Sequence, residues 1–234
     1  MYTLRINYSI EYNKNMKKII FTLFMSLFLV SCGNEISQTQ QPEDNNETPI
    51  NILALWDSLT AGYNLDISDS YPAQLENKLQ ENNYNYKIIN AGVSWDTSQN
   101  LLDRIDLYSD TTADIYLLTI WWNDALRRMS VENLKNNIQT IIDTIYQQNP
   151  DAKVVLSGMQ IPINYWLNYS KNFKEIYESL AEENDVYFYE FFLEDVAQKS
   201  DLNLSDGIHP NAKGYEIIAQ NLYNFLEDEK IILK

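Results

Sequence analysis

The sequence predicts an α/β protein built on a parallel sheet of five strands. Short apolar runs alternate with segments whose apolar residues recur at helical spacing, and this alternation is typical of βαβ units. The central runs have no polar face, as expected for strands that helices cover on both sides. Hydrophobic residues make up 45% of the 234 residues, which is enough for a sizeable core.

The expected elements follow one another from residue 50 to the end of the chain. We expect strands at 50–55, 86–89, 113–120, 152–158 and 186–191. We expect helices at 71–81, 96–108, 130–148, 170–184 and 211–228. Pro72 favours the start of the first helix, and the spacing from Asp96 to Gln99 is that of a capping box for the second. Ser130 can cap the third, which Pro150 then stops.

The first 32 residues have the pattern of a targeting segment. Lys17 and Lys18 precede the apolar run 19–30, which is too short to span a bilayer and is typical of a secretory signal. The next residues include Cys32, and the segment 29–32 resembles the bacterial lipobox, in which the cysteine is lipidated. An ordinary signal peptide with an incidental cysteine is the alternative. Met16 is a better start for this signal than Met1.

This reading divides the chain into three parts. Residues 1–32 form the signal peptide, 33–49 a polar flexible linker and 50–234 the folded domain. A lipid at Cys32 would place the domain in the cell envelope, outside the cytoplasm, anchored to a bacterial membrane.

The composition excludes several classes of function. Lys and Arg number 17 against 33 Asp and Glu, for a net charge of −16, so a basic nucleic-acid-binding surface is not expected. A single cysteine cannot form an internal disulfide. A single histidine, His209, argues against a structural zinc site and leaves one candidate for histidine-dependent catalysis.

The candidate chemistry lies in loops at the carboxyl ends of the strands, where parallel sheets bind ligands. Ser58 follows the first strand, Asn123 follows the third, and Asp206 and His209 precede the last helix. A serine nucleophile needs a base, and a carboxylate can hold that histidine in the right tautomer. An amide such as that of Asn123 can stabilise an oxyanion. Each residue also has a structural alternative as a helix cap or turn residue.

Four blocks in these loops together resemble the SGNH (GDSL) hydrolase superfamily, in the branch of arylesterases and acyl-CoA thioesterases/lysophospholipases. The family's blocks Gly-Asp-Ser-Leu-Thr-Ala-Gly-Tyr, Asn-Ala-Gly-Val-Ser-Gly-Asp-Thr-Ser, Gly-Gly-Asn-Asp and Asp-Gly-Ile-His-Pro-Asn are matched by residues 56–63, 90–98, 121–124 and 206–211. The stretch 158–166 is also similar to this branch. The resemblance extends from residue 50 to the C-terminus.

The resemblance implies a fold, an activity and a set of site residues. The fold is a three-layer α/β/α sandwich, flavodoxin-like in arrangement. The activity is that of a serine esterase on lysophospholipid, aryl or fatty-acyl esters, or on thioesters, with no metal and no organic cofactor. Ser58 is the nucleophile, His209 the base and Asp206 its orienter. The oxyanion hole consists of the backbone N–H groups of Ser58 and Trp95 and the amide of Asn123.

Other functions stay open at this point. A carbohydrate O-deacetylase is the alternative among enzymes, and a non-catalytic envelope lipoprotein is the alternative from another class. The expected partner is a small-molecule or lipid ester. No nucleic acid is expected, the membrane is reached only through the lipid anchor, and the oligomeric state is left undetermined.

The tryptophans depart from the family pattern. All five stand where the resembling sequences carry glycine, at positions 56, 95, 121, 122 and 166. Glycine numbers only 6, where average usage would give about 16. Either these tryptophans are real and the site is remodelled, or they are UGA codons that the cell reads as glycine. The second explanation accounts for both the scarce glycine and the placement of the tryptophans.

Overall fold

The computed structural model describes residues 48–120, 123–127, 129–160 and 167–234. The predicted signal peptide, the lipidation site Cys32 and the linker up to residue 47 lie outside the described residues. So do three of the tryptophans, at positions 121, 122 and 166. Among the described residues, no helix is long and apolar enough to cross a membrane.

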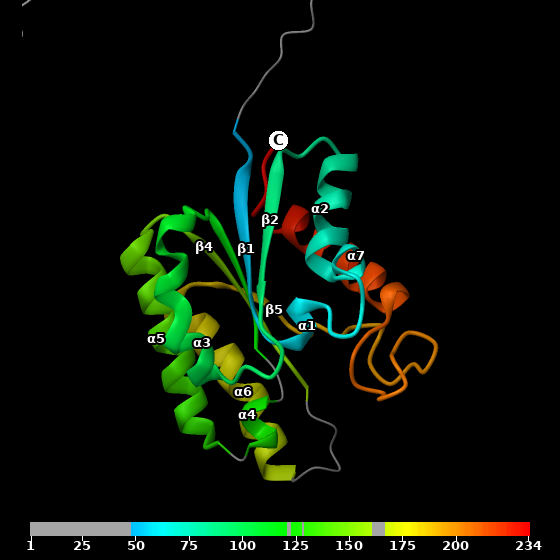
Figure 1. The fold of residues 1–234 in the computed structure, drawn as a ribbon. Coiled ribbons are helices and arrows are strands. Elements are labelled where there is room, and N and C mark those ends of the chain that lie inside the picture. The colour runs from blue at the N-terminus through cyan, green and yellow to red at the C-terminus, as the bar shows by residue number, and fades with distance from the viewer. Residues whose placement is uncertain (1–47, 121–122, 128, 161–166) are drawn as a thin grey trace, which may run out of the picture. The chain divides into compact units, whose positions relative to one another are not determined.

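Five strands form a single sheet in the order β2-β1-β3-β4-β5 (Figure 1). The strands are β1 (Ile50–Trp56), β2 (Tyr86–Gly92), β3 (Ile115–Thr119), β4 (Lys153–Ser157) and β5 (Tyr187–Tyr189). Every neighbouring pair is parallel, so the predicted five-stranded parallel sheet is confirmed. In this order the chain reverses its direction of travel across the sheet between β1 and β3, which is where flavodoxin-like sheets bind their ligands.

Helices cover both faces of the sheet, which gives the predicted three layers (Figure 1). On one face, α2 (Tyr71–Glu81) packs against α7 (Ala212–Asp228). On the other face, α5 (Val131–Gln148) packs against α3 (Ser98–Arg104) and α6 (Leu167–Asn184). The short helices α1 (Ser58–Ala61) and α4 (Asn123–Leu126) follow β1 and β3, and the 3-10 turns η2 (Ile67–Asp69) and η3 (Ile105–Thr111) complete the elements.

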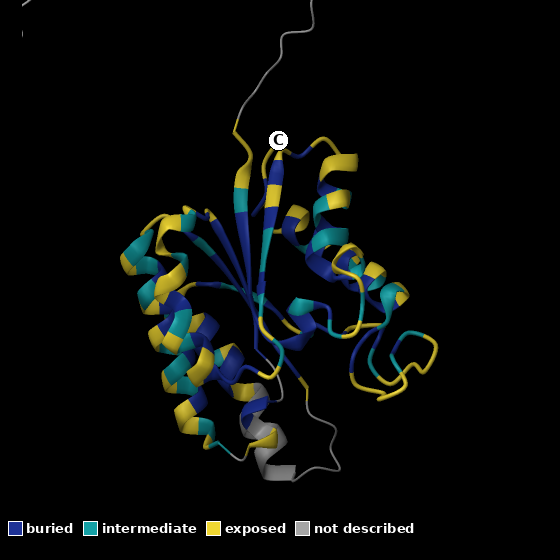
Figure 2. Cartoon of the chain, in the orientation of Figure 1, coloured by how far each residue is buried: buried dark blue, intermediate teal, exposed yellow. Residues whose placement is uncertain are grey.

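The core lies between these layers, and Figure 2 shows the central strands largely buried while the outer helix faces are exposed. Residues 52–55 of β1 have no exposed surface, as expected for a central parallel strand. In α5 the buried side chains recur at helical spacing, at Leu134, Ile138, Ile141, Ile142 and Ile145. Each such side chain contributes about 2 kcal/mol on burial, so this stripe fixes α5 on the sheet.

Most predicted elements are found with shifted ends. The helix over 71–81 matches α2, and Ser130 caps α5 by accepting a hydrogen bond from the backbone of Asn133 at 3.1 Å. The second strand continues to residue 92, because Gly92 still pairs with the end of β1. The last strand shortens to three residues, 187–189.

The predicted capping box from Asp96 to Gln99 is wrong by one position. Thr97 caps α3, and its partner in the box is Asn100, whose side chain accepts from the backbone N–H of Thr97 at 3.0 Å. The carboxylate of Asp96 is not available as a cap because it is paired with Arg104 at 2.7 Å. The helix also ends at residue 104 rather than 108 and continues as the 3-10 turn η3.

Candidate active site

Ser58 stands at the first position of α1, directly after β1. Asp57 is the N-cap of this helix, and its side chain accepts a hydrogen bond from the backbone of Leu59 at 2.9 Å. Gly62 ends the helix at a φ of 76°, where a side chain would be strained. Asp57 therefore acts as a helix cap, and the cap fixes the serine that follows it at the carboxyl edge of the sheet.

The imidazole of His209 joins Ser58 to Asp206. His209 Nε2 lies 2.9 Å from Ser58 Oγ, and His209 Nδ1 lies 2.8 Å from Asp206 Oδ2. With a proton on Nδ1 donated to the carboxylate, Nε2 can accept the hydroxyl proton of the serine. This is the geometry that an activated serine nucleophile requires.

A tight turn places Asp206 beneath its histidine. Asp206 Oδ1 accepts hydrogen bonds from the backbone of Ile208 at 2.9 Å and of His209 at 3.0 Å. Partial burial opposes the charge, but these N–H groups and the His209 ring outweigh it and lower the pKa of the Asp206 carboxyl. Asn211 then caps α7 by accepting from the backbone of Gly214 at 3.1 Å. The turn thus supplies both the orienting carboxylate and the entry into the last helix.

Tyr63 completes the surroundings of the histidine. Its ring lies 4.5 Å from the His209 ring between centroids, tilted by 35°. The Trp95 and Tyr63 rings are nearly perpendicular, with their centroids 6.3 Å apart. Trp95 is 59% exposed, so its indole lies at the protein surface beside Tyr63. Sequence reasoning did not select Tyr63, although it stands at the end of the first motif block.

Asn123 is held between the segments that carry the other expected oxyanion donors. Its Nδ2 donates to Asp57 Oδ2 at 3.0 Å and to the carbonyl of Asp96 at 2.9 Å. Asp57 precedes Ser58, and Asp96 follows Trp95, so the amide joins the two loops. Both amide hydrogens are engaged, and an oxyanion would have to share or replace one of these acceptors.

Buried carboxylates surround this amide. Complete burial raises the pKa of Asp57 to about 7; the backbone N–H of Leu59 opposes the shift, and the charges of Asp96 and Asp124 add to it. Burial also raises the pKa of Asp124, whose carboxylate accepts from the backbone of Ser98 at 2.8 Å and from its hydroxyl. Asp124 therefore fixes the loop after β3 to the start of α3.

Arg104 supplies a positive charge next to these buried carboxylates. Its Nε donates to Asp96 Oδ2 at 2.7 Å, and its Nη2 donates to the backbone carbonyl of Trp56 at 3.0 Å. Sequence reasoning missed this residue. No local signal marks it, because Asp96 lies before the N-cap of α3 and Arg104 is the last residue of that helix, so the two meet only in the folded loop.

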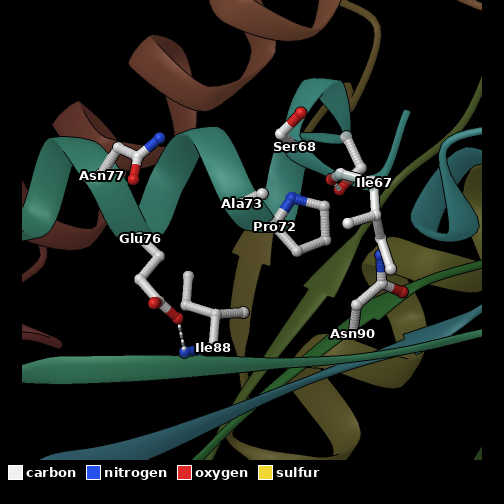
Figure 3. A pocket seen from close by; sticks show the side chains of 9 residues that line it. Ile67, Ser68, Pro72, Ala73, Glu76, Asn77, Ile88 and Asn90 are labelled. Carbon is white, nitrogen blue, oxygen red and sulfur yellow. Dashed lines mark hydrogen bonds between the residues drawn. The ribbon is translucent and has the colours of Figure 1, made fainter. Parts of the chain in front are cut away.

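A separate hollow of about 380 Å³ lies beside the sheet edge (Figure 3). It is formed by η2, α2 and the edge strand β2, and its lining does not include the serine, histidine and aspartate described above. Within it, Glu76 Oε2 accepts a hydrogen bond from the backbone of Ile88 at 2.5 Å, as Figure 3 shows. Glu76 thus occupies an N–H of the edge strand, which protects that edge against pairing with another chain.

A parallel α/β sheet with a Ser-His-Asp series at its carboxyl edge defines a serine hydrolase, and comparisons with known proteins specify it further. The sequence pattern of the GDSL-like lipase/acylhydrolase family matches residues 54–217. The chain therefore belongs to this family, the SGNH hydrolases, and is a carboxylic ester hydrolase.

Relatives and solved structures agree with this assignment. An arylesterase of Vibrio mimicus is 33% identical over 207 residues, covering 86% of this chain and 98% of the relative. Thioesterase 1/protease 1/lysophospholipase L1 of Escherichia coli K12 is 34% identical over 169 residues, covering 72% of this chain and 79% of the relative. The structure of the psychrotrophic esterase EstA from Pseudoalteromonas sp., inhibited by monoethylphosphonate, superimposes with a TM-score of 0.72 at 29% identity, covering 77% of this chain and 98% of that one.

Proposed function

We propose that this serine esterase uses Ser58 to attack the carbonyl carbon of an acyl ester and forms an acyl-enzyme. The single observation that carries the proposal is the unbroken series from Ser58 through His209 to Asp206, with separations of 2.9 and 2.8 Å. As Ser58 Oγ bonds to carbon, its proton passes to His209 Nε2. The imidazolium formed is stabilised by Asp206, whose lowered pKa keeps it ionised.

The negative charge that develops on the substrate oxygen is stabilised by donors from three loops. They are the backbone N–H groups of Ser58 and of residue 95 and the amide of Asn123. Ser58 is the first residue of α1, so its N–H has no acceptor within the helix. The alcohol or thiol then leaves with the proton from His209. A water molecule, deprotonated by the same imidazole, releases the acid and restores Ser58.

The surroundings of the site favour an apolar acyl group. Large apolar side chains are exposed at Val93, in the loop after β2, at Leu126, in α4 after β3, and at Ile208, beside His209. Exposed apolar surface of this kind is typical of a binding site for an apolar partner. The relatives named arylesterase and lysophospholipase agree with substrates of aryl or fatty-acyl type.

Labelling with a fluorophosphonate tests the nucleophile. We expect the purified protein to be labelled and Ser58→Ala to be unlabelled. Ser157→Ala is the matched control, because Ser157 is also buried, at the carboxyl end of β4, and its hydroxyl has no hydrogen-bond partner among the described residues. No labelling of the folded protein would contradict the proposal and favour a binding protein.

A series of p-nitrophenyl esters tests the substrate class. We expect kcat/KM to rise with acyl length from acetate to octanoate, by about tenfold or more, because each buried methylene adds about 0.8 kcal/mol. A lysophospholipid and an acyl thioester serve as substrates with natural leaving groups, an alcohol and a thiol. Activity confined to acetate esters, together with release of acetate from acetylated glycans, would instead support the deacetylase.

For the location, we propose that Cys32 is lipidated and anchors the domain to a bacterial membrane, outside the cytoplasm. The support is the position of the chain's only cysteine after the apolar run 19–30. Metabolic labelling with an alkyne fatty acid should mark the protein in the membrane fraction. Cys32→Ser should lose both the label and the membrane location, whereas Ser58→Ala should keep both. Label retained in Cys32→Ser would contradict the anchor.

A further inference from the structure

Two tryptophans hold backbone conformations that side chains of their size avoid. Among the described residues, the non-glycine residues with positive φ are mostly small or polar: Asn64, Asn83, Thr112, Asp185, Asp195, Gln198 and Lys230. The exceptions are Trp56, at a φ of 127°, and Trp95, at 75°. For a bulky residue a positive φ is a genuine outlier, whereas glycine adopts it freely. Both of the tryptophans that the structure describes are in this state.

Position 56 shows the stronger conflict. Its φ of 127° is larger than in the left-handed helical region. Essentially only glycine is found at such large positive values of φ. The indole is fully buried at the end of β1, and its Nε1 has no hydrogen-bond partner among the described residues. Buried indole N–H groups usually find an acceptor. The backbone of residue 56, by contrast, is well used, since its carbonyl accepts from Val93 at 2.7 Å and from Arg104 at 3.0 Å.

Position 95 shows the same conflict at the surface. Its carbonyl accepts from Arg127 at 2.8 Å, so the backbone is held, yet the indole is 59% exposed. Because most of the indole is exposed, its burial contributes little free energy to offset the backbone strain at this φ. Its ring centroid also lies 6.3 Å from that of Tyr63, whose ring packs on His209, so the indole stands close to the proposed base. At both positions the fold uses the backbone and has no evident use for the side chain.

We propose that the protein made by its cell carries glycine at positions 56 and 95, and that both codons are UGA. UGA is read as tryptophan in some genetic codes and as glycine in others, so one codon accounts for both residues. Glycine relieves the backbone strain at both positions and leaves the space beside Tyr63 open to substrate. The inference deepens the proposed function, because it concerns the loops that hold Ser58 and the backbone N–H of residue 95.

Peptide mass spectrometry of the protein from its native source tests the proposal directly. Trypsin releases Ile88–Arg104, which contains position 95, and a Glu-specific protease releases Thr48–Glu76, which contains position 56. Gly92 and Gly62 lie in the same two peptides as internal glycine controls. We expect both peptide masses to fit glycine and the two codons to be UGA. Tryptophan in either peptide would overturn the proposal at that position.

Recombinant variants test the consequence for the site. Trp95→Gly should raise kcat for p-nitrophenyl butyrate by about tenfold or more without lowering Tm. Asn83→Gly is the matched control, since it removes an exposed residue at a φ of 62° away from the site and should leave kcat unchanged. A fall in kcat or in Tm in Trp95→Gly would count against the proposal. If the native peptides carry glycine but the protein is not labelled by a fluorophosphonate, the esterase mechanism is refuted. The proposal of glycine at these positions then still stands.

Discussion

The carboxylate of Asp57 and the amide of Asn123 meet inside the protein, with Asn123 Nδ2 3.0 Å from Asp57 Oδ2 and both side chains buried. The residue that caps the helix of the proposed nucleophile thus also holds the proposed oxyanion donor. This contact joins the loop after β1 to the loop after β3 across the sheet. The properties of the site therefore depend on a carboxyl group that does not touch substrate in the proposed mechanism.

This buried carboxyl makes stability depend on pH. The pKa of Asp57 is raised from 3.8 to about 7, so the folded state keeps a proton that the unfolded chain releases at lower pH. Its contribution is fully present below about pH 4 and is lost as pH rises through about 7. Between these values the free energy of unfolding should fall by about 1.4 kcal/mol per pH unit from this group.

Urea unfolding at pH 5, 6, 7 and 8 measures this slope. Asp57→Asn should flatten it, because asparagine does not titrate and still caps a helix well. Asp124, whose pKa burial also raises, leaves a residual slope of the same sign. Asp201→Asn, at an exposed aspartate, is the control and should keep the full slope. An unchanged slope in Asp57→Asn would show that this carboxyl is ionised throughout.

Arg104 should matter for turnover more than for substrate binding. Its guanidinium joins Asp96 to the carbonyl of residue 56, and so ties together the two loops expected to stabilise the oxyanion. Arg104→Lys keeps the charge next to Asp96 but cannot make both hydrogen bonds in the same geometry. We expect kcat to fall by about tenfold with KM nearly unchanged.

The control for Arg104→Lys is Lys135→Gln, which removes the half-exposed ion pair with Glu183 on the outer helices. It should change neither kcat nor KM, because exposed ion pairs contribute little. Thermal melting of both variants separates a loss of positioning from a loss of folding. A kcat for Arg104→Lys equal to that of the parent protein would show that the oxyanion donors are positioned without this contact.

Tyr63 should support His209 through its ring alone. The ring centroids lie 4.5 Å apart, and the structure gives the tyrosine hydroxyl no role in that contact. Tyr63→Phe should therefore keep kcat within about twofold, whereas Tyr63→Ala should lower it by about three- to tenfold, as expected for the loss of an aromatic pair. Equal losses in both variants, measured with p-nitrophenyl butyrate, would assign the effect to the hydroxyl.

Two glycines with similar backbone angles separate strain from crowding. Gly62 has a φ of 76°, and a Cβ added there would lie 2.7 Å from Ser70 Cβ; Gly207 has a φ of 70°, and a Cβ there would meet nothing within 4 Å. Gly207→Ala should cost about 1 kcal/mol of unfolding free energy from backbone strain alone. Gly62→Ala should cost about 2 kcal/mol or more, because the end of α1 must also move. If urea unfolding shows equal losses of unfolding free energy in the two variants, Ser70 moves away from the added Cβ without a cost in free energy.

The layers of the fold could be predicted from the sequence because hydrophobic periodicity is local. The spacing of apolar residues in α2 and α5 places both helices correctly, and the continuous apolar run of β1 identifies a central strand. The ends of α3 could not be predicted. They depend on the pairing of Asp96 with Arg104, and that pairing forms only when the loop is folded.

The part of the site that follows from the sheet topology could be predicted from the sequence. Parallel strands bring the loops after β1 and β3 to one edge, so Ser58 and Asn123 could be assigned to a common site before any distance was known. The link between Asp57 and Asn123 was not predictable, because 66 residues separate them and nothing local marks a carboxyl as buried. Tyr63 was missed for the same reason, since its contact with His209 arises only in the folded chain.

The separation of Ser58 from His209 along the chain has a consequence for biosynthesis. The two residues lie 151 positions apart, and the turn that carries the histidine directly precedes the last helix, α7. A loop of this length closes late, after the local helices and neighbouring strands have formed. The proposed nucleophile would therefore have no base while the chain is still emerging, and we expect hydrolysis to begin only once α7 has docked. We therefore expect esterase activity to appear only when folding is complete.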